Sequence, residues 1–182
     1  MTLKTLRAVL TGAFFLFAAV HPTSAVVLEQ GENYIGGTQI EVPELGVSFY
    51  IPQGWEGSRP EGIDFFVMSP DKSSFIFVFA RQGNLDDMRK IFSRRVFIGE
   101  KYVLSPTSEP IVSFDKVGVP FQVDDDDGDF SSYGWARAGG NGSIIAFIGV
   151  GPATNGPALA LVLQRLVQDV TFSEKSAQTN SQ

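Results

Sequence analysis

Apolar and polar residues alternate along much of the chain, and this alternation predicts a series of short strands. Residues 45–51 place Val47, Phe49 and Ile51 on one face. Residues 75–80 are apolar on both faces, which is typical of a strand at the centre of a sheet. Further strands are predicted at residues 39–42, 63–68, 111–114, 119–123, 130–138, 143–150 and 169–172.

Two other segments follow the three-and-four spacing of an amphipathic helix. The first begins after Asn84, whose side chain suits a helix N-cap, and its apolar stripe consists of Leu85, Met88, Ile91 and Phe92. The second opens at residues 155–157, and its stripe consists of Leu159, Val162, Leu163, Leu166 and Val167.

Turn signals at Asp127-Gly128 and at residues 140–142 indicate consecutive hairpins, and therefore antiparallel pairing. The order of elements predicts an α+β fold, in which a twisted antiparallel sheet is packed by two amphipathic helices. We place this single domain at residues 39–172. A loosely ordered lead-in is expected at residues 26–38 and a flexible tail at residues 173–182.

The first 25 residues have the features of a secretory signal peptide. Lys4 and Arg7 precede the uncharged apolar stretch 8–20, which is too short to span a bilayer. Small residues before the junction predict cleavage between Ala25 and Val26. We therefore expect a secreted protein, periplasmic in a Gram-negative cell and otherwise extracellular or lumenal. No cysteine follows the leader, so no lipid anchor is expected.

The composition limits the partners of such a protein. The full chain has a net charge of −6, and loss of the two basic residues of the leader makes it −8. This charge disfavours nucleic acid and anionic lipid as partners. Because the chain has no cysteine, its stability must come from its core, to which all but three of its 16 phenylalanines are available.

The segment GVSFYIPQGW at residues 46–55, the succession of strands, helix, hairpins and helix, and the closing DVTF at residues 169–172 resemble the PsbP-like/DcrB-like superfamily. This superfamily includes extrinsic photosystem subunits, bacterial envelope proteins and a Ran-binding import factor. The resemblance implies a sheet-and-helix sandwich and an accessory, non-catalytic role. It implies no site residues, and the metal-binding histidines of some photosystem members are missing here.

The residue inventory also excludes several enzyme classes. The single histidine, His21, leaves with the leader, so histidine-dependent nucleophilic catalysis and histidine metal sites are ruled out. Ser113 and Lys116 match S-x-x-K, the motif that opens a helix in penicillin-interacting enzymes. Here the motif lies at a strand end, and we do not assign it a catalytic role.

Five carboxylates crowd into six positions, Asp124, Asp125, Asp126, Asp127 and Asp129. A solvated hairpin turn explains them best, because charge runs usually stay solvated. The alternative is a calcium site, since calcium prefers oxygen ligands, although the spacing does not fit an EF-hand loop. We expect no other cofactor.

Two groups of residues are candidates for binding a protein or a small ligand. A basic cluster gathers near the first helix and includes Arg89, Arg94 and Arg95, together with Arg81, Lys90 and Lys101. A docking patch for an acidic partner and a solvated helix face are both consistent with it. The aromatic candidates are Trp55, Tyr133 and Trp135, which either line a groove or cap the core.

Three hypotheses of function remain. The first is an exported non-catalytic accessory module that binds a protein or ligand. The second is a hydrolase of the glycosidase type that uses carboxylates alone and requires two acids facing each other in a cleft. The third is a module stabilised by calcium. Asn141 also opens an N-x-S glycosylation sequon, which matters only in a eukaryotic secretory pathway.

Overall fold

The structure is a computed structural model that describes residues 25–60, 66–99, 102–124 and 129–174. A small sheet has the strand order β1-β3-β4-β14, with the bounds β1 Val26–Val27, β3 Gln39–Val42, β4 Val47–Tyr50 and β14 Thr171–Phe172. Its β1–β3 pair is parallel, and the other pairs are antiparallel.

A large antiparallel sheet forms the rest of the β structure. In spatial order its strands are β2 Asn33–Ile35, β5 Glu56–Ser58, β6 Phe66–Ser69, β7 Phe75–Gln82, β13 Ser143–Pro152, β12 Phe130–Ala138, β11 Lys116–Val123, β9 Tyr102–Pro106 and β8 Val96–Ile98. Strand β10, Ile111–Ser113, pairs with β11 beside this path. The helices are α1, Leu85–Phe92, and α2, Gly156–Asp169, and the 3₁₀ turns are Pro43–Leu45 and Ala153–Asn155. The predicted α+β class is confirmed.

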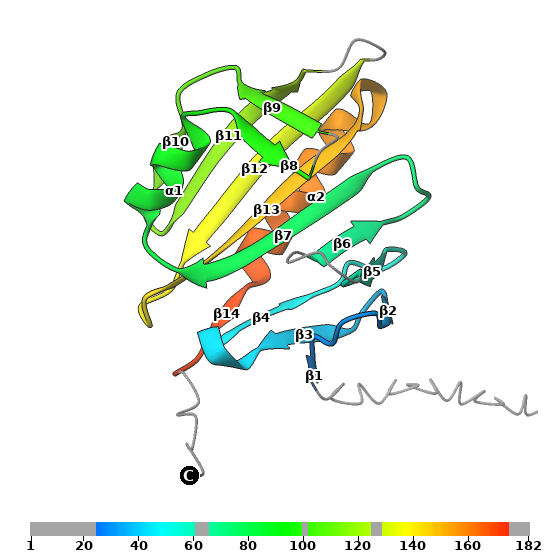
Figure 1. Cartoon of the computed structure of the whole chain (residues 1–182), viewed down its shortest axis with the longest axis vertical. Coiled ribbons are helices and arrows are strands. Elements are labelled where there is room, and N and C mark those ends of the chain that lie inside the picture. Colours follow the sequence, from blue (N-terminus) through cyan, green and yellow to red (C-terminus); the bar gives the residue numbers. More distant parts are fainter. Residues whose placement is uncertain (1–24, 61–65, 100–101, 125–128, 175–182) are drawn as a thin grey trace, which may run out of the picture.

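Helix α2 and the small sheet cover one face of the large sheet (Figure 1). Phe147 of β13 meets Phe49 of β4 edge-on, with 5.6 Å between the ring centroids. Gly149, two residues further along β13, lies under Leu159 and Leu163 of α2. This face therefore carries a core that joins residues from both ends of the chain.

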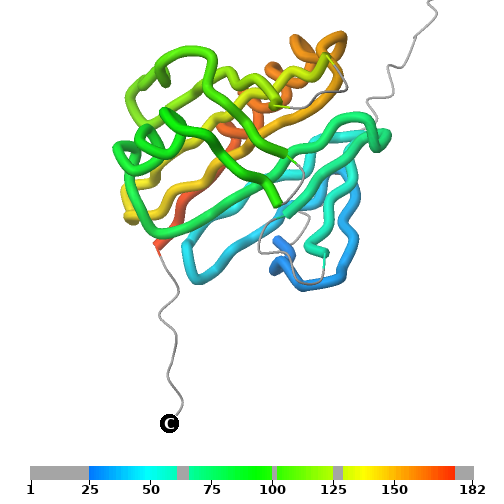
Figure 2. Tube along the Cα trace, turned by 45° about the horizontal axis from the view of Figure 1, so that its top comes forward, coloured from blue at the N-terminus to red at the C-terminus, as the bar shows by residue number. Residues whose placement is uncertain are grey.

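Helix α1 and the hairpin β8–β9 cover part of the opposite face. The large sheet curls, so that Tyr102 of β9 approaches Phe77 of β7 with 6.0 Å between the ring centroids, although three strands separate β9 from β7 in the sheet. Figure 2 shows the green segment that follows β7 lying over the yellow and orange strands. Phe92 of α1 is buried in the core on this face, and its ring lies edge-on to that of Phe121, with 5.7 Å between the ring centroids.

The sequence located most elements close to their observed bounds. Both helices, the hairpin turn at residues 140–142 and a β7 strand in the middle of the sheet were predicted. Residues 26–38, expected as a lead-in, contain the short strands β1 and β2, and the strands β5, β8 and β9 were not predicted. The leader up to residue 24, the Asp127-Gly128 turn and the tail from residue 175 lie outside the described residues.

Candidate functional site

Helix α1 begins with a reciprocal pair of hydrogen bonds. The backbone N–H of Asp87 donates to Oδ1 of Asn84 over 3.1 Å, and the backbone N–H of Asn84 donates to Oδ2 of Asp87 over 3.4 Å. This capping box satisfies amide groups that the first turn leaves without partners. Met88 and Phe92 are buried beneath the helix, so α1 is fixed both at its start and along its inner face.

An apolar cleft of about 220 Å³ opens beside α1. Strands β7 and β13 form its floor, α1 forms one wall, and the first residues of β8 form the other. Its apolar lining comes from Phe79, Ala146 and Ile148, from Met88, Ile91 and Phe92, and from Val96 and Phe97. Phe97 is 67% exposed although it borders this cleft. The cleft therefore presents apolar surface to the solvent.

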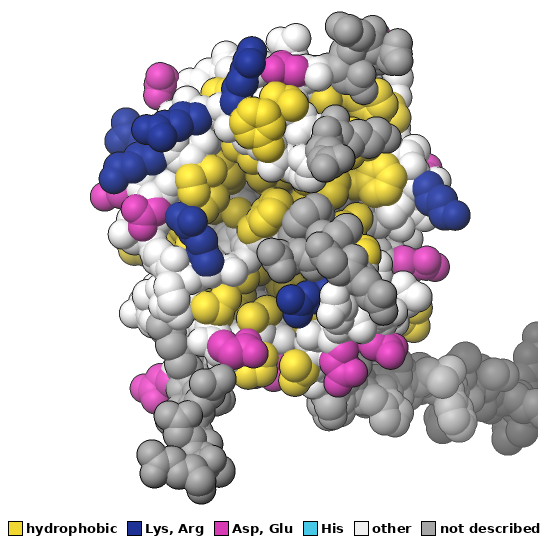
Figure 3. Space-filling view, viewed as in Figure 1, with side chains coloured by type: hydrophobic (Ala, Val, Ile, Leu, Met, Phe, Trp, Pro, Cys, Tyr) yellow, Lys and Arg dark blue, Asp and Glu magenta, His cyan; other side chains and the backbone are white. Residues whose placement is uncertain are grey.

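Basic side chains lie in the α1 cleft and on the outer side of α1. Among the described residues, Arg81 is the charged residue in the lining of the cleft. Arg89, Lys90 and Arg94 line a shallow depression on the outer side of α1, together with Asp86. Figure 3 shows dark blue side chains gathered over α1 beside the yellow apolar side chains in the middle of this face. Arg95 is 68% exposed, and its Nε lies 3.6 Å from Oδ2 of Asp124.

The aromatic candidates lie elsewhere. Trp55 lines a groove of about 330 Å³ between the turn after β4 and helix α2, together with Tyr50, Val162 and Arg165. Tyr133 and Trp135 are half-buried and pack against the core under α2. The structure thus brings the predicted arginines together around α1, and it places the three aromatic residues on the other side of the large sheet.

Of the five aspartates in the predicted calcium loop, Asp124 and Asp129 belong to the described residues, and residues 125–127 do not. Oδ2 of Asp124 accepts a hydrogen bond from Ser105 Oγ over 2.8 Å. Within the described ranges, no three acidic, histidine or cysteine side chains gather where they could hold a metal ion. Because residues 125–127 lie outside the described residues, the calcium hypothesis stays a prediction.

Ser113 and Lys116 face each other across the turn of the β10–β11 hairpin. The S-x-x-K motif acts in enzymes when a helix brings serine and lysine to one face. As cross-strand partners, Ser113 and Lys116 also share one face here, but they lie beside a hairpin turn and not in the first turn of a helix.

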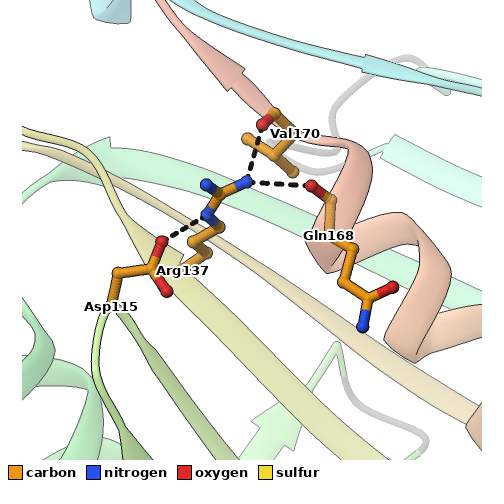
Figure 4. A network of polar contacts seen from close by, with 4 residues as sticks. All are labelled: Asp115, Arg137, Gln168 and Val170. Carbon is orange, nitrogen blue, oxygen red and sulfur yellow. Dashed lines mark hydrogen bonds and ion pairs between the residues drawn. The ribbon is translucent and has the colours of Figure 1, made fainter.

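Arg137 joins three elements at the end of α2 (Figure 4). Its Nε donates to Oδ2 of Asp115 over 2.6 Å, and its guanidinium also donates to the backbone carbonyls of Gln168 and Val170 over 3.0 and 2.8 Å. Burial, the largest single influence, disfavours the charged form of Asp115. The hydrogen bond and the charge of Arg137 together outweigh burial and hold the pKa of Asp115 below its ordinary value.

Asn141 ties the β12–β13 turn to the small sheet. Its Nδ2 donates to the carbonyl oxygens of Leu45 and Ser173 over 3.0 and 2.8 Å, and its Oδ1 accepts from the backbone N–H of Ser143 over 3.0 Å. A glycan would leave this nitrogen a single N–H and would therefore displace at least one of the two carbonyl contacts. The sequon therefore serves a structural purpose in the folded protein.

No protein-family model and no curated protein matches the sequence. Among solved structures, the chain is similar to the solution structure of cyanobacterial PsbP (CyanoP) from Synechocystis sp. PCC 6803, with a TM-score of 0.48, 10% identity, and coverage of 78% of this chain and 92% of that one. It is also similar to a crystal structure from Bacteroides thetaiotaomicron VPI-5482, with a TM-score of 0.43, 14% identity, and coverage of 81% and 50%. Both are likenesses of fold at low sequence identity.

The sequence analysis did not identify the apolar lining of the α1 cleft. The sequence analysis did not select Phe97, because the sequence around it does not show whether another strand covers its side chain. The signal available was the segment 94–98, where Phe97 interrupts a run whose other apolar residues, Val96 and Ile98, fall on one face. In the part of the chain that the structure describes, no helix has the length and apolar character needed to cross a membrane.

Proposed function

We propose that this chain is an exported, non-catalytic accessory module that binds an acidic amphipathic segment of a partner protein in the α1 cleft. The observation that carries the proposal is a solvent-open apolar lining that includes Arg81, with Arg89, Lys90 and Arg94 on the outer side of the same helix, on a chain whose net charge is negative.

The size of the cleft favours a protein segment over a small molecule. Small-molecule sites usually enclose about 300–1,000 Å³, whereas this cleft has about 220 Å³. It suits the insertion of one or two apolar side chains, as in the docking of an amphipathic helix into a groove. Arg81, Arg89 and Arg94 would then attract acidic residues on the flanks of that segment.

A carboxylate-only hydrolase is less well supported. Glu56 and Asp71 line one open depression of about 310 Å³. A glycosidase general acid needs a raised pKa, but hydrogen bonds from Ser73 lower the pKa of Asp71. The α1 cleft itself has no carboxylate in its lining.

Export of the chain is also part of the proposal. It rests on the charged start, the short apolar stretch and the small residues before Ala25. Processing there would release the described domain into the periplasm, the extracellular space or an organelle lumen. Mass determination of the N-terminus of exported protein tests this separately from the binding site.

The binding site can be tested by site-specific photo-crosslinking in the exported fraction. A photoreactive residue at Phe97 should capture a partner, and the same residue at Ile35, which is 72% exposed on β2, serves as the matched control. The crosslinked peptide should contain apolar residues flanked by Asp or Glu. A synthetic copy of it should bind more weakly as salt is raised.

Charge reversal completes the experiment. Arg94→Glu should weaken binding of the synthetic peptide about tenfold or more, because it places repulsion beside the cleft. Arg165→Glu, in the groove beside α2, should leave binding unchanged. Equal loss in both variants, or a crosslinked peptide without acidic residues, would contradict the proposed site.

A further inference from the structure

The β10–β11 hairpin carries exposed apolar side chains that the core does not use. Phe114, at its turn, is 100% exposed, and Ile111 and Val112 on β10 are 66% and 48% exposed. All three residues of β10 are exposed. Among the described residues, β10 pairs with one strand of the sheet, β11. The hairpin is therefore an apolar feature separate from the α1 cleft.

The backbone at Phe114 adds a second observation. Its φ is +51°, in the left-handed region that glycine or asparagine usually occupies. Ser113 pairs with Lys116, so Phe114 and Asp115 form a two-residue turn in which Phe114 holds a position that favours glycine. A fully exposed phenylalanine there contributes strain and no packing to the fold, which points to a role outside the folded chain.

The turn is held firmly in place. Asp115 accepts the hydrogen bond from Arg137 Nε, and its backbone carbonyl accepts from the N–H of Ala138 over 2.9 Å. Arg137 in turn holds the end of α2. The exposed phenylalanine is thus presented by a rigid support, and the charge of Asp115 is compensated within the protein.

The apolar residues of the hairpin face in different directions. Ile111 pairs with Gly118, which lies against Trp135 on the α2 side of the large sheet. Val112 pairs with Val117, which belongs to the core on the α1 side. Successive strand residues point to opposite faces. With Phe114 at the turn, the hairpin therefore carries exposed apolar side chains on both faces and at its end, beside the polar residues Ser113 and Lys116.

We propose that the β10–β11 hairpin is a wedge that inserts into the surface of a lipid bilayer, with Phe114 at its tip. A protein partner would offer a surface to one face of the hairpin, whereas a fluid bilayer surrounds an inserted tip on all sides. The bilayer best suited is electrically neutral, because a chain with a net charge of −6, or −8 without its first 25 residues, is repelled by anionic lipid. Such shallow insertion gives weak and reversible attachment.

Co-flotation with phosphatidylcholine vesicles tests this inference on the chain recovered after export, with its N-terminus determined by mass. Phe114→Gly should lower the partition coefficient about tenfold or more, because it removes the main apolar group of the tip. Ile35→Ser, which removes an apolar residue that is 72% exposed on β2, should leave it within about twofold of wild type.

The stability of Phe114→Gly separates membrane binding from a structural role. Glycine suits a positive φ, so the melting temperature of this variant should equal or exceed that of wild type. In Phe114→Trp, brominated phosphatidylcholine should quench a tryptophan signal that the wild-type protein, with Trp55 and Trp135 alone, does not lose.

Several results would overturn the inference. These are wild-type protein that does not float with the vesicles, an equal loss in Ile35→Ser, a lower melting temperature for Phe114→Gly, or a concentration-dependent dimer that Phe114→Gly abolishes in the absence of lipid. The last result would identify a second copy of the chain as the occupant. None of these results bears on the α1 cleft, whose test probes Phe97 and Arg94 and shares with this one the control position Ile35.

Discussion

Arg137 on β12 and Asp115 in the β10–β11 turn form a 2.6 Å charged hydrogen bond, and through the same guanidinium Asp115 is linked to the last carbonyls of α2. The side chain of Arg137 therefore connects the β10–β11 turn, which carries Phe114, with helix α2, which covers one face of the large sheet. The Arg137 guanidinium also lies 5.8 Å from the centre of the Phe172 ring, so the final strand shares this support.

We expect Arg137→Met to destabilise the fold by about 1–3 kcal/mol, because it leaves a half-buried carboxylate and two carbonyls without their donor. Chemical denaturation measures this loss. Arg165→Met, which removes an arginine from the groove beside α2, is the control. Equal losses in the two variants would refute a special role for the Arg137 network.

The Asp115 pair also predicts how stability depends on pH. The lowered pKa of folded Asp115 means that its ionised form stabilises the fold above the unfolded pKa of about 4. This contribution is lost as pH falls through the folded pKa. The stability difference between wild type and Asp115→Asn should thus be constant from about pH 6 to 8 and shrink below about pH 4. A difference that grows on acidification would contradict the assignment.

Gly149→Ala tests the close contact between β13 and α2. An added Cβ would lie 2.9 Å from Leu163 Cδ1 and 3.0 Å from Leu159 Cδ1, so we expect a loss of about 1–3 kcal/mol as the helix shifts. Gly140→Ala is the matched control, since a Cβ there meets nothing within 4 Å. Thermal unfolding of both variants gives the comparison, and similar melting temperatures would argue against tight packing at Gly149.

The N-cap of α1 gives a prediction for the candidate site. Asn84→Ala should cost about 1 kcal/mol through loss of the capping box, and Asn84→Ser should restore most of it. Hydrogen exchange should show faster opening of α1, whose residues Met88 and Ile91 form a wall of the cleft. Unchanged exchange in α1 would mean that packing alone fixes the start of the helix.

Asn141→Ala should destabilise the protein by about 2 kcal/mol, because it removes the hydrogen bonds to the carbonyls of Leu45 and Ser173. Asn155→Ala is the control, since the Asn155 side chain makes no capping hydrogen bond to α2. Denaturant titration compares the two, and an effect of similar size in both would rule out the role of Asn141 as a tie to the small sheet.

Local signals in the sequence were enough for much of the fold. The cap at Asn84 and the spacing of Met88 and Phe92 act within one helix, and alternation placed Tyr133, Trp135 and Arg137 on one face of β12. What covers that face depends on long-range packing. The sequence therefore left open whether the aromatic residues line a groove or cap a core, and in the structure Tyr133 and Trp135 pack against the core under α2.

The α1 cleft could be predicted only in part for the same reason. The clustering of Arg89, Arg94 and Arg95 follows from their proximity in sequence. The apolar lining requires β8 to fold back toward β7, and this depends on the curl that brings Tyr102 to Phe77. A three-residue strand such as β8 has too few residues for its alternation to be recognised.

The pairing of β7 with β13 affects how the chain acquires its structure during synthesis. β7 ends at Gln82, whereas its partner β13 begins only at Ser143. Likewise, β4 pairs with β14, which lies near the end of the described residues. A nascent chain that has emerged only as far as β12 lacks the strand in the middle of its large sheet. The large sheet can therefore be completed only after residues 143–152 have been synthesised.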